Sequence, residues 1–361
     1  MSWRESLRAV ATPLTASVDR VVARAITGRS EAAKRRSRAE SLGHDERVVA
    51  LDRITSSYDA GAFAEAGGFF DLAPEPNVVE TPRGLRSRGP ADTHIVDLSW
   101  TSTPPLHAID PVLRERYRAI TENARGHARV FVGRGDWSRP TAIIIHGYRS
   151  GQYAIEERVW PINWLLERGM NLALFVLPFH AVRGKLGVPA FPGSDPRFTN
   201  EGFRQAIFDL TTLKAALNAR GSSSVGAMGM SLGGFTVSLW GTLCPLAFLA
   251  PVIPLASFAD VAKAGGRLVG TEQEQALQHL KLEQAHRIIS PFTRPSQVDP
   301  DAVIVVAGEG DRITPLAHAE RLRDHYGAAY VTFPGGHLLQ IGRSEGFRAI
   351  GRMLNKRGLL T

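Results

Sequence analysis

Cysteine is almost absent from this sequence, since Cys244 is the only one in 361 residues. A single cysteine excludes an internal disulfide, which is typical of a reducing compartment, so we expect a cytoplasmic or membrane-peripheral location. We interpret Cys244 itself as a small apolar side chain near a helix end. The histidines and acidic residues form no cluster at metal-ligand spacing, so the sequence predicts no metal site, and nothing in it indicates a cofactor.

Unbroken apolar runs are also missing. The uncharged stretch 221–259 contains Pro245, Pro251 and Pro254 between its apolar residues, so none of its pieces could cross a bilayer as one helix. Burial in a parallel sheet explains this stretch better. At the N-terminus, the mild apolar run 9–18 is interrupted by Pro13, and we expect no cleaved signal peptide.

Positive charge is concentrated in one segment. Residues 1–40 hold nine Lys or Arg against four acidic residues, a net charge of +5 out of +8 for the chain. This distribution indicates a basic N-terminal arm and little excess positive charge over the rest of the chain, so we expect no nucleic-acid partner. Residues such as Trp3, Leu7, Val10 and Leu14 recur in this arm at helical spacing. The arm is therefore predicted either to touch anionic membranes weakly or to dock on the protein's own surface or a partner subunit. The sequence does not fix the oligomeric state.

A serine between glycines is the most informative feature that is present. Gly229-Met230-Ser231-Leu232-Gly233 follows a short strand-like run and precedes apolar residues at helical spacing. This setting is typical of a nucleophile elbow, in which a strand turns sharply into a helix and exposes the serine. A Cβ at Gly229 or Gly233 would collide with the neighbouring strand and helix. Ser231 is the predicted nucleophile.

Strand and helix patterns alternate from residue 94 onward, with a solidly apolar strand at 141–145. Alternation of this kind predicts an α/β fold, a doubly wound and mostly parallel sheet. We expect an N-terminal extension over residues 1–90, with an irregular connection over residues 61–90, and one catalytic domain over residues 91–361, with helices around residues 155–168 and 202–219. The capping box at Thr271 precedes an amphipathic helix, so the insertion 255–298 is predicted to form a helical lid, or else to pad the sheet edge.

A serine nucleophile needs a base, and the base needs a carboxylate. Asp311 comes just after the predicted strand 302–307, and His337 just after the predicted strand 329–333. Catalytic groups of such sheets lie where parallel strands end, so both should lie at the same edge as Ser231. Asp260 is a second candidate acid, but it lies a helix length into the insertion.

His146-Gly147-Tyr148 follows the buried strand 141–145 and is well placed to stabilise an oxyanion. We assign the donors to the backbone N–H groups of Tyr148 and Leu232, with Gly147 giving room and His146 in a structural role. Arg183, in the loop after the predicted strand 171–177, could bind an anionic substrate group, or could form a salt bridge that stabilises the loop.

Together these residues give the chain a resemblance to the α/β-hydrolase superfamily. The resemblance rests on His146-Gly147, the elbow at Ser231, the pattern Gly308-x-x-Asp311-x-x-x-Pro315, and Gly336-His337, and it covers about residues 90–361. It implies a Ser231-His337-Asp311 triad and hydrolysis of an acyl bond through an acyl-enzyme.

The resemblance does not imply a substrate, because this fold serves esterases, lipases, thioesterases, peptidases and acyltransferases. From the sequence we expect a serine esterase or lipase-like enzyme acting on a small to medium apolar ester, or alternatively a peptidase, thioesterase or acyltransferase that uses the same triad. The alternative from another class is a catalytically silent, membrane-peripheral or interaction protein that uses the basic arm.

Overall fold

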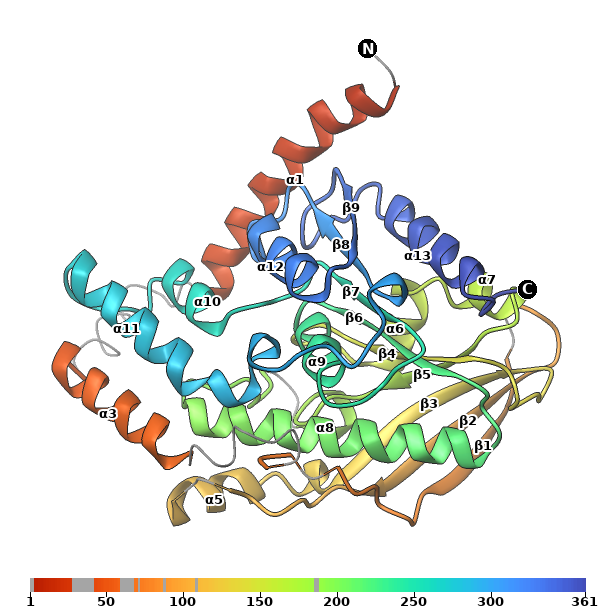
Figure 1. The fold of residues 1–361 in the computed structure, drawn as a ribbon, viewed down its shortest axis with the longest axis horizontal. Coiled ribbons are helices and arrows are strands. Elements are labelled where there is room, and N and C mark those ends of the chain that lie inside the picture. The colour runs from red at the N-terminus through yellow and green to blue at the C-terminus, as the bar shows by residue number, and fades with distance from the viewer. Residues whose placement is uncertain are drawn as a thin grey trace.

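The computed structural model describes residues 3–27, 42–58, 68–70, 72–86, 89–107, 110–184 and 188–361. Its centre is a sheet of nine strands (Figure 1). In chain order the strands are β1 (Val79–Leu85), β2 (Thr93–Thr101), β3 (Arg125–Gly133), β4 (Thr141–Ile145), β5 (Asn171–Phe175), β6 (Val225–Met230), β7 (Leu249–Val252), β8 (Ile304–Gly308) and β9 (Ala329–Phe333).

The spatial order of the strands is β1-β2-β3-β5-β4-β6-β7-β8-β9. β1 pairs antiparallel with β2, β2 with β3, and β3 with β5, whereas the strands from β5 to β9 in this order run parallel. The chain reverses its winding direction at β4, which lies between β5 and β6. Loops that follow strands at such a reversal are where this class of sheet builds its sites. The predicted fold class, a doubly wound and mostly parallel sheet, is confirmed.

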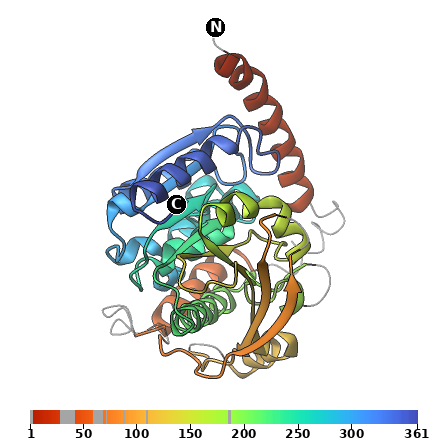
Figure 2. The same ribbon diagram turned by 90° about the vertical axis from the view of Figure 1, so that its right-hand side faces the viewer.

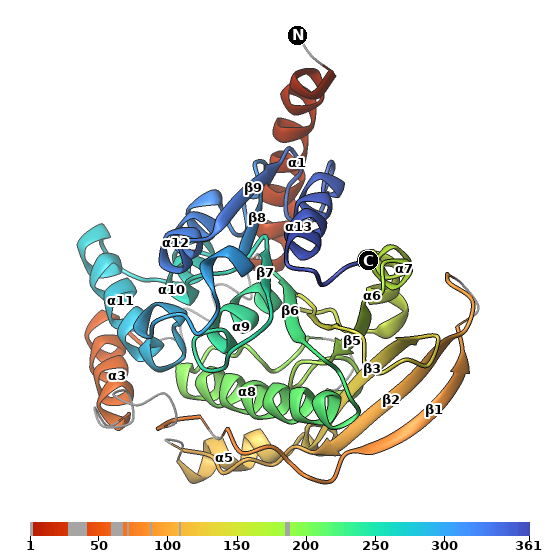
Figure 3. The same ribbon diagram turned by 45° about the vertical axis from the view of Figure 1, so that its right-hand side comes forward.

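Helices cover both faces of the sheet. α8, α9 and α12 lie on one face and α7 and α13 on the other (Figure 3). The remaining helices lie around these layers. The bounds are α1 (Trp3–Thr27), α3 (His44–Ser57), α5 (Pro111–Arg118), α6 (Tyr153–Val159), α7 (Ile162–Glu167), α8 (Pro196–Ala219), α9 (Leu232–Trp240), α10 (Phe258–Ala264), α11 (Glu272–Ala285), α12 (Leu316–Tyr326) and α13 (Ser344–Lys356). β4 to β8 are buried along their whole length, which explains their continuous apolar sequences.

Three elements differ from the sequence-based expectation. The helix expected around residues 155–168 is two helices, α6 and α7, separated at Pro161, whose ring cannot continue a helix. α8 begins at Pro196, six residues before the expected start, because the Asp195 carboxylate caps it by accepting the N–H of Arg197. β1 lies in the segment expected to be irregular, before the boundary at residue 90, and it extends the main sheet.

The insertion after β7 packs against the N-terminal part of the chain. α11 lies beside α3, with Lys281 Nζ 2.7 Å from Asp52 Oδ1 and the Gln278 amide 3.0 Å from His44 Nδ1. Leu277 and Leu280 are exposed at the surface. The polar residues of α11 therefore make the contact with α3, and whether the insertion acts as a lid stays a prediction.

α1 is continuous through Pro13, and its N-terminal end projects beyond the rest of the molecule in all three ribbon views. Figure 2 shows its other half beside the C-terminal part of the chain, drawn in blue. Ala11, Thr15, Ala16 and Asp19 are buried in this contact. Of the two interpretations of the basic arm, docking on the protein's own surface is thus observed. No helix within the described ranges is both long and apolar enough to cross a membrane.

Candidate active site

Ser231 lies at the turn between β6 and α9, with φ 55° and ψ −112°. This left-handed conformation is strained for a residue with a Cβ and is characteristic of functional turns. A Cβ on Gly229 would collide with the carbonyl of Gly233, and a Cβ on Gly233 would collide with the carbonyl of Ile145 in β4. The predicted strand-turn-helix geometry and the steric need for both glycines are confirmed.

The neighbouring strand holds this turn in place. The N–H of Ser231 donates to the carbonyl of Val252 in β7 at 3.0 Å, and the Ser231 carbonyl accepts the N–H groups of Phe235 and Leu255, both at 3.1 Å. The Ser231 side chain is half-buried, and its hydroxyl makes no hydrogen bond with another described residue. The backbone at Ser231 is therefore fixed while the hydroxyl oxygen stays free to react.

Asp311 and His337 are brought together by the loops after β8 and β9. Asp311 is 1% exposed, and its Oδ2 lies 2.8 Å from Nδ1 of His337. Its Oδ1 accepts the backbone N–H groups of Ile313 at 2.8 Å and Thr314 at 2.7 Å. The Thr314 hydroxyl lies 2.9 Å from Oδ2 and 3.0 Å from the carbonyl of Ile253. A carboxylate held this firmly fixes the imidazole and leaves Nε2 of His337 for another partner.

The surroundings of His337 favour its protonated form. Burial alone would lower the pKa of the imidazole, but the charge and hydrogen bond of Asp311, together with the charge of Asp19 in α1, outweigh burial and raise the pKa above its ordinary value. A histidine that accepts a proton more readily is suited to the role of a base that passes through an imidazolium.

Asp260, the second candidate acid, has other partners. Its Oδ1 lies 2.7 Å from Nε2 of His279, and its Oδ2 lies 3.4 Å from Arg321 and 3.6 Å from His318. Asp311, and not Asp260, is the carboxylate bonded to His337.

One group of side chains in the described part of the chain has the spacing of a metal site, namely Asp260, His279 and Glu283. Their ligand atoms lie within 4.8 Å of one another. However, the Arg321 guanidinium already pairs with Asp260, and Glu283 accepts the hydroxyl of Ser257. A neighbouring guanidinium opposes a bound cation, so we assign the group to a network that ties α10, α11 and α12 together.

The loop after β4 lies against Ser231. A Cβ on Gly147 would be 3.5 Å from Cβ of Ser231, which is ordinary contact distance. The N–H groups of Tyr148 and Leu232, the expected oxyanion donors, find no acceptor among the residues that the structure places. Leu232 opens α9, where the first N–H groups of a helix have no intrahelical partner. Both groups are therefore available to an external anion.

His146 ties this loop to the neighbouring strand. Its Nδ1 lies 2.7 Å from the carbonyl of Gly147, and its Nε2 accepts the N–H of Leu177 at 3.1 Å. Burial lowers the pKa of His146 to about 4, against the opposing effect of the hydrogen bond to Gly147. A neutral ring bonded at both nitrogens has the structural role that we expected of it.

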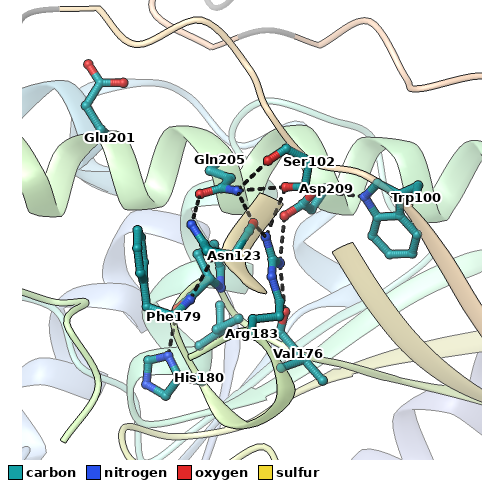
Figure 4. Close-up of polar contacts among 12 residues, drawn as sticks. Trp100, Ser102, Asn123, Val176, Phe179, His180, Arg183, Glu201, Gln205 and Asp209 are labelled. Carbon is teal, nitrogen blue, oxygen red and sulfur yellow. Dashed lines mark hydrogen bonds and ion pairs between the residues drawn. The ribbon is translucent and has the colours of Figure 1, made fainter. Parts of the chain in front are cut away.

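Arg183 is a structural residue and does not face an anionic substrate. It is fully buried, and its guanidinium lies 2.7 Å from Oδ2 of Asp209 and donates to the Ser102 hydroxyl and to the carbonyls of Asn123 and Val176 (Figure 4). Of the two interpretations, the structure supports the salt bridge. Because both charges are fully buried, loss of either one would leave the other uncompensated.

His180 is a residue near this site to which the sequence assigned no role. Its ring centre lies 5.0 Å from that of His146 and 6.0 Å from that of Tyr148. Burial, aided by His146, lowers its pKa to about 3, so the ring is neutral. The flanking residues Phe179 and Ala181 both have positive φ, at 61° and 45°. In the sequence, only the position of His180 just after the predicted strand 171–177 indicates a place near the site. Contacts between loops leave no pattern in the local sequence.

Comparison with known proteins supports the fold. No model of a known protein family matches the sequence, and no curated protein sequence matches it. Among solved structures, acetyl xylan esterase 1 from Thermoanaerobacterium sp. JW/SL YS485 superposes with a TM-score of 0.56 at 17% identity, covering 84% of this chain and 98% of the esterase. An acetyl xylan esterase from Paenibacillus sp. R4 gives 0.57 at 12% identity, covering 85% and 99%. At such low identities the likeness shows a shared fold.

Proposed function

This chain has the α/β-hydrolase fold, and from that premise we propose that it is a serine hydrolase that cleaves a carboxylic ester through an acyl-enzyme on Ser231. Ser231 is the nucleophile, His337 the general base and acid, and Asp311 the carboxylate that orients His337. The backbone N–H groups of Tyr148 and Leu232 form the oxyanion hole. The substrate is an ester with a small to medium apolar acyl group.

In the first half of the reaction, Oγ of Ser231 attacks the ester carbonyl carbon while Nε2 of His337 takes the hydroxyl proton. Asp311 accepts the hydrogen bond from Nδ1 and stabilises the positive charge on the ring. The carbonyl oxygen becomes an oxyanion, and the two backbone N–H groups donate to it. Collapse of this intermediate breaks the bond to the alcohol oxygen, which leaves with the proton from His337.

In the second half, water attacks the acyl carbon of the ester formed with Ser231, and His337 takes a proton from that water. The tetrahedral intermediate forms at the same two N–H groups. When it collapses, His337 returns the proton to Oγ of Ser231, and the carboxylic acid is released. The net reaction is ester plus water giving acid plus alcohol, and the enzyme returns to its starting state.

The proposal rests on two features of one sheet. Ser231, after β6, is strained at φ 55°. His337 and Asp311, after the neighbouring strands β9 and β8, have Nδ1 and Oδ2 2.8 Å apart. A structural turn would not need a strained serine whose hydroxyl has no partner among the described residues. The two superposed structures are both named as acetyl xylan esterases, which favours an ester over an amide and places acetyl esters among the first substrates to try.

The direct test is labelling with a fluorophosphonate, which phosphonylates an activated serine. The folded protein should form one covalent adduct, located on Ser231 by peptide mass spectrometry, and Ser231→Ala should form none. Ser238→Ala is a matched control, because Ser238 lies in α9 with its hydroxyl bonded to the carbonyl of Gly234. Turnover of p-nitrophenyl esters from acetate to decanoate would then define the acyl length. A folded protein that forms no adduct at Ser231 would disprove the proposal.

A further inference from the structure

α1 reaches both loops that carry the base and the acid. The Thr12 hydroxyl donates to the carbonyl of Pro334 at 3.1 Å, three residues before His337. Arg8 lies 3.3 Å from Glu309, two residues before Asp311. On the far side of the helix, Val10 and Leu14 are exposed. α1 therefore uses its small and polar face for the contact with the protein.

At the centre of this contact lies the carboxylate of Asp19, which is fully buried. Its Oδ2 accepts the backbone N–H of His337 at 2.6 Å and that of Arg312 at 3.3 Å, and its Oδ1 accepts the N–H of Leu338 at 3.1 Å. No Lys or Arg whose side chain the structure describes forms a salt bridge with Asp19. A buried carboxylate is costly unless it is hydrogen-bonded, so these three donors hold its charge.

The two loops leave room for α1 at two glycines. A Cβ on Gly336 would lie 2.7 Å from Oδ2 of Asp19, and a Cβ on Gly310 would collide with the hydroxyl of Thr15. Neither glycine has a positive φ, so the closeness of α1, and not backbone strain, is what requires the missing side chain. Helix and loops are thus fitted to each other in shape as well as in hydrogen bonding.

We propose that Asp19 is a positioning residue for the catalytic histidine, and that α1 is part of the catalytic apparatus of this chain. The inference rests on the proposed function, because it assigns Asp19 a role through His337. Asp19 accepts the backbone N–H groups of His337 and Leu338, and also that of Arg312, the residue after Asp311. It therefore fixes the backbone at His337 and ties it to the loop that carries Asp311. The imidazole is thereby held where Nδ1 meets Asp311 and Nε2 is left for the nucleophile.

Asp19 also acts through its charge. Among the side chains that the structure describes, the ionisable groups that face His337 are Asp311 from the loop after β8, Asp19 from α1, and His318 from α12. Burial lowers the pKa of His318, which opposes a positive charge on that ring. The negative charge of Asp19 raises the pKa of His337. Removing that charge must therefore lower the pKa of His337, and the acid limb of kcat/KM must move to lower pH.

The test is Asp19→Asn, which keeps the shape of the side chain but removes its charge and one acceptor. We expect kcat to fall about 10- to 100-fold, because small misplacements of a catalytic group have effects of this size. We also expect the acid limb of kcat/KM to move to lower pH. The matched control is Ser17→Ala on the exposed side of α1, whose hydroxyl bonds only within the helix, and it should leave both quantities unchanged.

A second measurement does not depend on activity. Nuclear magnetic resonance titration of the His337 ring should give a lower pKa in Asp19→Asn than in the unsubstituted protein, even if the substrate has been misidentified. Failure of Ser231 to react with fluorophosphonate, with the pKa change still present, would overturn the proposed function and leave the positioning intact.

Two results would overturn the proposal for Asp19. One is an Asp19→Asn variant with unchanged kcat and an unchanged pKa of His337. The other is loss of activity in step with loss of thermal stability while the pKa stays the same, which would mean that Asp19 only stabilises the fold. If Asp19→Asn does not fold, Gly336→Ala replaces it, because its methyl group displaces Asp19 from the loop and should change kcat and the pKa in the same directions.

Discussion

The turn at Ser231 and the loop at His337 are held in place in different ways. The turn is fixed by glycines next to the serine and by β7, the adjacent strand of the sheet. The loop is fixed by Asp19, which is 318 residues away in the sequence, in a helix outside the sheet. The proposed nucleophile is thus part of the core of the fold, whereas the proposed base depends on a separately docked helix.

This difference has a physical consequence for stability and for control of the enzyme. Displacing the turn would require β6, β7 and α9 to shift inside a close-packed core, which is costly. Displacing α1 would break the packing of Ala11 and Ala16 and the hydrogen bonds of Asp19 and Thr12, all at one side of the protein. The geometry of the base should therefore be easier to disturb than that of the nucleophile, and the predictions below test that comparison.

The largest expected effect is that of His337→Ala. Removing the base leaves Oγ of Ser231 protonated, so ester turnover should fall by about six powers of ten, the size seen when a member of such a unit is lost. The measurement is kcat with a short-chain ester, with circular dichroism to show that the variant is folded. A variant that keeps a tenth of the activity would exclude His337 as the base.

Asp311→Asn should lower kcat by about four powers of ten, because an amide cannot hold the imidazole in the required tautomer. Asp260→Asn is the matched control, since Asp260 is also bonded to a histidine, His279, but in the insertion. It should leave kcat within about twofold of the original, as expected for a partly exposed pair. The opposite pattern, with Asp260→Asn inactive, would show that the acid has been misassigned.

Gly233→Ala tests the rigidity of the turn. The new methyl group would collide with the carbonyl of Ile145, so β4 or α9 must move, at a cost of about 1–3 kcal/mol of unfolding free energy. The fluorophosphonate labelling rate should fall together with Tm. Gly43→Ala serves as the control, because the nearest atom to its Cβ would be 3.8 Å away. An unchanged Tm in Gly233→Ala would mean that the turn is less tightly packed than the structure indicates.

The pH dependence of activity should reflect the raised pKa of His337. Only the neutral imidazole can act as a base, so kcat/KM should fall as the pH drops through the pKa of the folded protein, which lies above the ordinary histidine value of about 6.5. In Asp311→Asn the raising carboxylate is gone, and the limb should move to lower pH. A limb below pH 6 in the unsubstituted enzyme would contradict the electrostatic surroundings described for His337.

Sequence patterns predicted the parallel half of the sheet and the place of Ser231, Asp311 and His337 along it. They did so because buried parallel strands are continuously apolar, and the loops that follow them are marked by glycines and polar residues. The sequence does not predict β1, because all of its residues are exposed and it therefore lacks the alternation of apolar and polar residues that marks a half-buried strand. The early start of α8 has a sequence signal in Asp195-Pro196, a capping carboxylate followed by a proline at the first helical position.

Asp19 could not have been found in the same way. Its surroundings in the sequence, Val18-Asp19-Arg20, suggest an acidic residue on the surface of a basic helix. Only the tertiary contact with residues 312, 337 and 338 shows that it is buried. The helix was predicted from its apolar stripe, but it docks through Ala11, Thr15, Ala16 and Asp19, whereas Val10 and Leu14 of the stripe remain exposed.

The smallest expected effect concerns that exposed stripe. We propose that Val10 and Leu14, on an arm with a net charge of +5 over residues 1–40, contact anionic lipid weakly. Each basic residue near such a surface contributes about 1 kcal/mol, and salt screens the attraction over roughly 10 Å, so binding should fade as ionic strength rises.

Deleting residues 1–40 would not test this alone, because it also removes Asp19. The double variant Val10→Ser, Leu14→Ser changes only the exposed side. It should lose co-sedimentation with phosphatidylglycerol vesicles and keep its turnover of a soluble ester. If the unsubstituted chain does not sediment, and the double variant instead dissociates an oligomer in analytical ultracentrifugation, then the stripe packs against a second copy of the protein.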